Sequence, residues 1–114
     1  RTEAVVLRRQ LAARGFNEAV TYAFVEAEAL ARWSLDDGSV PLANPLSAEL
    51  AVMRTSLLPG LVEALARNAA RQQPRVRLFE AGRVFHAVDR AAPRETPRLA
   101  AVACGAVDAE QWAL

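Results

Sequence analysis

The apolar residues of this chain recur with the spacings of short helices and strands joined by turns. Residues 3–14 have the pattern of a helix, with an acid in the first turn and arginines towards the end, which suits the helix dipole. We expect Gly15 to end this helix in the left-handed conformation, with Phe16 folding back onto it. Residues 19–25 then alternate between two faces, which carry Val20, Tyr22 and Phe24 on one side and Thr21, Ala23 and Val25 on the other. The β-branched and aromatic residues predict a strand covered on both faces.

Shorter elements are predicted after this strand. Residues 26–33 are rich in alanine and predict a short helix, and the Asp and Gly content of residues 36–39 predicts a turn. Residues 40–43 suffice for a short strand. Pro45 then interrupts the chain, because proline pushes the residue before it out of the helical region.

The best helix pattern follows Ser56, which is a candidate N-cap. Pro59 lies in the first turn, where its missing N–H is not needed. The apolar residues at helical spacing are Leu58, Leu61, Val62, Leu65 and Ala69. Burial of such large side chains, at about 1.5–3 kcal/mol each, outweighs an exposed ion pair such as Glu63 with Arg67.

Two interpretations stay open for residues 76–87, which alternate as a strand does but contain Gly82: two short strands, or one strand bent at the glycine. The prolines and charges of residues 89–98 predict an exposed connection. A further strand is expected over residues 99–104, and residues 108–111 resemble a capping box that opens a last helix. This order of elements favours the α+β class, with a mostly antiparallel sheet flanked by helices, over regular βαβ crossovers.

Composition limits the classes of protein to consider. The 114 residues, 53% hydrophobic and 24% charged, fit one globular domain over residues 1–114 and exclude a disordered chain or a two-domain enzyme. We expect both ends to be truncated, since residue 1 is Arg and the last residues fall within a helical pattern. No apolar run approaches the roughly 20 residues of a membrane span, and a net charge of +1 gives no strong field towards nucleic acid. A single cysteine cannot form an internal disulfide, and a lone thiol indicates the cytoplasm.

Candidate chemistry is sparse. His86 and Cys104 are the only residues of their kinds, and no zinc-binding or calcium-binding pattern is present. No serine lies in a GxSxG sequence, and the five glycines are too scattered for a phosphate-binding loop. We interpret His86 as a strand residue near the rim of the sheet and Cys104 as a small core residue. The residues alone therefore indicate no catalytic, cofactor-binding or metal-binding side chain.

The strongest charge feature is the stretch from Arg67 to Arg83, in which one acid, Glu80, stands among five arginines: Arg67, Arg71, Arg75, Arg77 and Arg83. One interpretation is a small RNA-binding module that uses the first four of these arginines. The other is an ordinary solvated face, because Arg67 and Arg71 lie opposite the apolar stripe and no aromatic array offers base stacking. The solvated face is favoured, and the RNA-binding module stays open as the alternative.

A long resemblance to a known family covers nearly the whole chain. Residues 44–85, NPLSAELAVMRTSLLPGLVEALARNAARQQPRVRLFEAGRVF, strongly resemble the core region of the beta subunit of bacterial phenylalanyl-tRNA synthetases. GFNEAVTYAFVE at residues 15–26 is similar to the family's strand after its opening helix. RLAAVACGAVDAEQW at residues 98–112 is similar to its next strand and the start of the following helix.

The resemblance implies a truncated class II synthetase-like core, related to the catalytic domain of the alpha subunit but without its chemistry. In that family the alpha subunit activates phenylalanine with ATP, and the beta core pairs with it in an α2β2 enzyme that uses magnesium and tRNA. The expected role is therefore a noncatalytic scaffold and alpha-subunit interface. Apolar surfaces that lack their neighbours are expected to make the isolated chain self-associate.

One position departs from the catalytic pattern. Catalytic class II domains carry an arginine that holds ATP at the end of the strand resembling Gly82–Phe85, and this chain has His86 there. A mostly neutral imidazole is a poor substitute for a fixed bidentate cation. Arg83 lies nearby but is not carried over as an ATP ligand.

Overall fold

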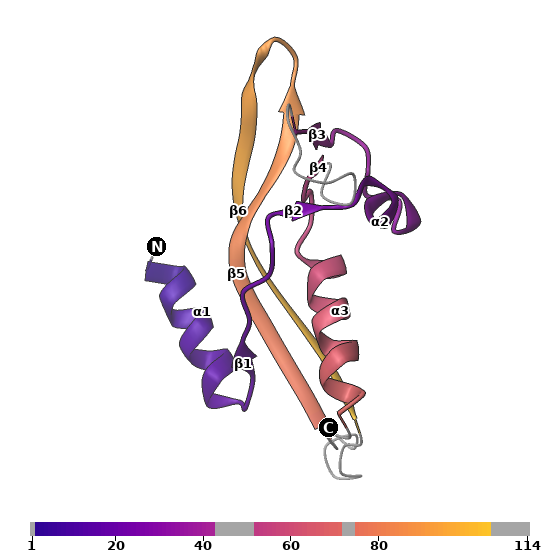
Figure 1. The fold of residues 1–114 in the computed structure, drawn as a ribbon. Coiled ribbons are helices and arrows are strands. Elements are labelled where there is room, and N and C mark those ends of the chain that lie inside the picture. Colours follow the sequence, from indigo (N-terminus) through magenta and orange to yellow (C-terminus); the bar gives the residue numbers. More distant parts are fainter. Residues whose placement is uncertain (1, 43–51, 72–74, 106–114) are drawn as a thin grey trace.

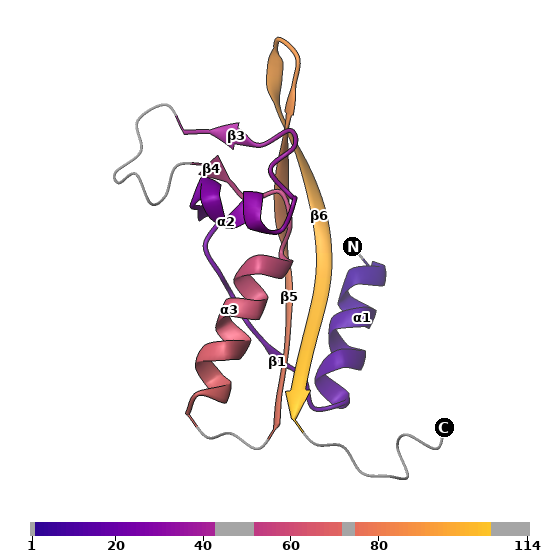
Figure 2. The same ribbon diagram turned by 90° about the vertical axis from the view of Figure 1, so that its right-hand side faces the viewer.

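The structure is a computed structural model that describes residues 2–42, 52–71 and 75–105. Two helices lie on opposite faces of a three-stranded sheet of order β1-β5-β6, and a second small sheet of order β2-β4-β3 lies beside its upper half (Figures 1 and 2). The elements are α1 (Thr2–Ala13), β1 (Asn17–Glu18), β2 (Phe24–Val25), α2 (Ala27–Arg32), β3 (Val40–Pro41), β4 (Val52–Met53), α3 (Leu58–Ala69), β5 (Arg75–Val88) and β6 (Ala91–Gly105). The α+β class is therefore as predicted. The single flanked sheet is replaced by two small ones, in which β1 pairs with β5 in parallel and the other described ladders are antiparallel.

The first helix ends as the sequence predicts. Gly15 has a φ of +87°, its N–H donates to the carbonyl of Ala12 at 3.1 Å, and the N–H of Phe16 donates to the carbonyl of Leu11 at 3.0 Å. These two bonds make a Schellman ending. The guanidinium of Arg77 on β5 lies 5.8 Å from the centre of the Phe16 ring, so this ending is fastened to the sheet.

A long hairpin dominates the sheet and corrects one prediction. Residues 76–87 lie in one continuous strand, β5, so the one-strand interpretation is right and Gly82 does not break it. Residues 89–98 are not a loop, because β6 begins at Ala91 and pairs with β5 along nearly its whole length. Prolines are tolerated here because β6 is an edge strand among the described strands, and because the register shifts between His86 and Val88.

The prediction of a covered strand over residues 19–25 is wrong. Only Phe24 and Val25 of this segment form a strand, β2, and the preceding residues form a connector that joins β1 to β2. The expected alternation is nevertheless present, since Ala19, Thr21, Ala23 and Val25 are partly buried and the residues between them are exposed. Val20 is 90% exposed and Tyr22 82% exposed, because no described element lies over their face.

Several smaller predictions are confirmed. Residues 26–33 contain the short helix α2, and residues 36–39 form a turn in which the N–H of Ser39 donates to the carbonyl of Asp36 at 3.1 Å. The strand expected over residues 40–43 is present as β3 at Val40–Pro41, and residue 43 lies outside the described residues. Pro45 and residues 108–111 lie outside the described residues.

The main core lies between α3 and one face of the hairpin. Its buried members are Leu57, Leu61, Ala64, Val76, Leu78 and Val84. The oxygen of Ser56 accepts the N–H of Leu58 at 3.1 Å, but the N-cap of α3 is Leu57, so the prediction of Ser56 as N-cap is one residue early. The apolar stripe is rotated from the prediction, because Leu57 takes a buried place while Leu58 and Ala69 are exposed.

Cys104 is exposed, so its prediction as a core residue is wrong. It pairs with Val76 near the end of β6, where an edge strand has a neighbour on one side only. Val76, on the central strand, is buried instead.

Candidate functional site

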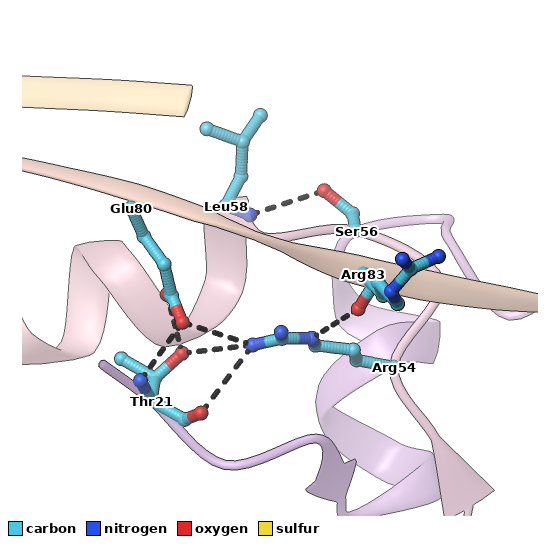
Figure 3. Close-up of polar contacts among 6 residues, drawn as sticks. All are labelled: Thr21, Arg54, Ser56, Leu58, Glu80 and Arg83. Atoms are coloured by element: carbon cyan, nitrogen blue, oxygen red, sulfur yellow. Dashed lines mark hydrogen bonds and ion pairs between the residues drawn. The ribbon is translucent and has the colours of Figure 1, made fainter. Parts of the chain in front are cut away.

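The most concentrated polar chemistry in the described chain is a buried cluster formed by Arg54, Glu80 and Thr21 (Figure 3). The Nη1 of Arg54 lies 3.3 Å from the Oε2 of Glu80, and the two side chains are 8% and 3% exposed. The hydroxyl of Thr21 donates to the Oε1 of Glu80 at 2.7 Å, and the Thr21 N–H donates to Oε2 at 2.9 Å. Both carboxylate oxygens therefore have partners.

Arg54 makes further bonds that use most of its donors. Its Nε donates to the carbonyl of Arg83 at 2.8 Å, and its Nη1 also lies 3.2 Å from the hydroxyl of Thr21. Its backbone N–H donates to the carbonyl of Ala23 at 2.8 Å, and its carbonyl accepts the N–H of Phe85 at 2.9 Å. One residue thus joins three segments: the connector after β1, the end of β4, and β5.

Gly82 makes room for this arginine. A Cβ placed on Gly82 would lie 2.5 Å from the Nη2 of Arg54 and 3.4 Å from the Cδ2 of Leu57. The first distance is far below any normal contact, and Arg54 cannot swing aside without losing its bonds. Glycine is therefore required by close packing at this point of β5 rather than by backbone conformation.

The buried ion pair is stable only if all hydrogen-bonding groups of the cluster have partners. Withdrawing two charges from water costs several kcal/mol per ion, and their attraction offsets this cost only when their other hydrogen-bonding groups are satisfied. No buried side-chain nitrogen or oxygen lacks a partner among the described residues. Removing either charge would leave the other buried and unpaired.

The structure disperses the basic stretch that the sequence singled out. Arg67 and Arg71 lie on α3 or directly after it, whereas Arg75, Arg77 and Arg83 belong to β5. Along β5 these arginines alternate with Val76, Leu78 and Val84, which face α3. The two groups of arginines are therefore on opposite sides of the sheet.

Several of these arginines form ion pairs or hydrogen bonds with nearby residues. Arg67 lies 3.7 Å from Glu63, and Arg83 lies 3.6 Å from Glu95, both in exposed pairs. Arg77 donates to the carbonyl of Arg14 at 2.7 Å. Three of the five arginines, Arg67, Arg77 and Arg83, therefore have partners within the described chain.

His86 lies on β5 towards the hairpin turn and is partly buried. Its Cδ2 would lie 3.7 Å from a Cβ placed on Gly38, and the N–H of Ala87 donates to the carbonyl of Gly38 at 2.8 Å. His86 thus packs against the turn before β3. Within the described ranges, no three His, Cys, Asp or Glu side chains are grouped so that they could hold a metal ion.

No helix in the described part of the chain is long and apolar enough to cross a membrane.

Comparison with known proteins places these features in a family. The family model described as the phenylalanyl tRNA synthetase beta chain CLM domain matches residues 3–114. The chain belongs to this phenylalanyl-tRNA synthetase beta chain family. A phenylalanine–tRNA ligase beta subunit of Xylella fastidiosa is 59% identical over 114 residues, and one of Xanthomonas oryzae pv. oryzae is 60% identical over 108 residues. These alignments cover 98% and 93% of the chain but only 14% of each relative.

A solved structure supports the fold assignment. PylSc of Desulfitobacterium hafniense, a pyrrolysyl tRNA synthetase, superposes with a TM-score of 0.60 at 24% identity. The superposition covers 82% of this chain and 33% of that one. At this level of identity the likeness concerns the fold of the beta chain domain alone.

The sequence did not single out the pairing of Arg54 with Glu80. Both residues stand in the strings that carry the family resemblance, MRTSLLPGL and RLFEAGRVF. One signal was available in the sequence, because Glu80 is the lone acid in RLFEAGRVF and follows the apolar Leu78 and Phe79. An acid in such a strand needs a buried partner, although the sequence does not say which residue supplies it.

We expect Glu80→Gln to lower the free energy of unfolding by about 3–5 kcal/mol, because it leaves the guanidinium of Arg54 buried without a countercharge. Urea unfolding followed by circular dichroism measures the change. Glu63→Gln is the matched control, since its ion pair with Arg67 is exposed and contributes at most about 1 kcal/mol. Equal effects of the two substitutions would contradict the assignment.

Gly82→Ala should destabilise the chain by about 1–3 kcal/mol through overpacking against Arg54. The direction of the stability change is informative, because replacing glycine by alanine in a strand interior normally stabilises a protein by roughly 0.5–1 kcal/mol. Ala81→Ser, at the exposed neighbouring position, should change little. A higher urea midpoint for Gly82→Ala would show that Arg54 does not approach this backbone closely.

Proposed function

We propose that this chain is a noncatalytic core segment of the beta subunit of phenylalanine–tRNA ligase, serving as scaffold and as interface for the alpha subunit. Membership of the beta chain family supports the assignment to this ligase. In this proposal the whole enzyme, an α2β2 assembly in the cytoplasm, joins phenylalanine to its tRNA with ATP and magnesium. This segment contributes no group that reacts.

The observation that carries the noncatalytic role is the internal commitment of Arg54. Arg54 is the buried cation of the described chain, and its guanidinium is bonded to Glu80, Thr21 and the carbonyl of Arg83. Binding of a nucleoside triphosphate such as ATP requires cationic side chains that are fixed and point into a cleft. A guanidinium that already neutralises a buried carboxylate does not meet that requirement.

The position at which catalytic class II domains carry an ATP-binding arginine is occupied here by His86, and neither His86 nor the nearby Arg83 is suited to bind a nucleotide. His86 packs against the turn at Gly38, and Arg83 is exposed beside Glu95. An exposed arginine already paired with an acid is a weak anchor for phosphate. We therefore derive no catalytic step through ATP or magnesium for these residues.

The scaffold role is supported by the apolar surface that the described elements leave uncovered. On α1, Val5, Val6 and Leu7 are each 44–46% exposed. A groove of about 450 Å³ lies between α1 and β1, and its lining combines Val5, Phe16 and Phe79 with the charged Arg8, Arg9 and Glu18. We infer that these exposed side chains contact another protein surface, and that they favour self-association of the isolated chain.

The competing hypothesis, a small RNA-binding module, has less support. Its four arginines, Arg67, Arg71, Arg75 and Arg77, are divided between α3 and β5 on opposite sides of the sheet. A single strand of RNA tracking one basic groove cannot contact both groups.

Phenylalanine-dependent exchange of pyrophosphate into ATP tests the noncatalytic role. We expect no exchange with the 114-residue chain alone. We expect exchange by the intact alpha–beta enzyme that changes less than about twofold when the beta subunit carries His86→Ala, because this imidazole touches no reacting group. Exchange by the isolated chain, or its loss on His86→Ala in a folded complex, would contradict the proposal.

A further inference from the structure

We draw no further inference here: the strongest candidate, the exposed apolar face that Val20, Tyr22 and Phe24 form on the segment leading from β1 into β2, carries nothing, because nothing in the structure shows what covers it.

Discussion

The ion pair between Arg54 and Glu80, together with the backbone hydrogen bonds beside it, joins segments that belong to different strand ladders. The connector after β1 makes no ladder with β5 between residues 19 and 23, and β4 is only two residues long. Through Thr21, the carboxylate of Glu80 fastens the connector, and through its guanidinium and its backbone Arg54 fastens the end of β4. The small second sheet and the start of α3 are placed by the same contacts.

This arrangement links stability to the proposed role. A buried ion pair is tolerated when all its hydrogen-bonding groups have partners, and it destabilises the fold when one partner is missing. Arg54, the cation that is buried among the described residues, is enclosed with its own countercharge. The same carboxylate that neutralises Arg54 also accepts two hydrogen bonds from Thr21 and so positions the connector after β1.

Local signals were sufficient where neighbouring residues decide the structure. The Gly15 ending and the turn before Ser39 depend on contacts within a few residues, and the sequence predicted both. The prolines of residues 89–98 led to the wrong prediction of a loop. An edge strand tolerates proline and a central strand does not, and the position of a strand in the sheet depends on the whole fold. The prediction of Cys104 as a core residue was wrong for the same reason, because Cys104 lies on this edge strand. Arg54 and Glu80 lie 26 positions apart, and only the topology brings them together. The family resemblance, in contrast, was available from the sequence and is confirmed.

The central claim is that the buried pair fixes the connector, and hydrogen exchange at the Thr21 amide tests it most directly. This N–H donates to the Glu80 carboxylate rather than to any strand, so ladder protection does not explain its behaviour. The account predicts that in the native protein it exchanges only on global unfolding, as slowly as the central amides of β5, and that Glu80→Gln accelerates it more than those amides. Exchange of the Thr21 amide at the rate of an exposed loop in the wild-type protein would contradict the account.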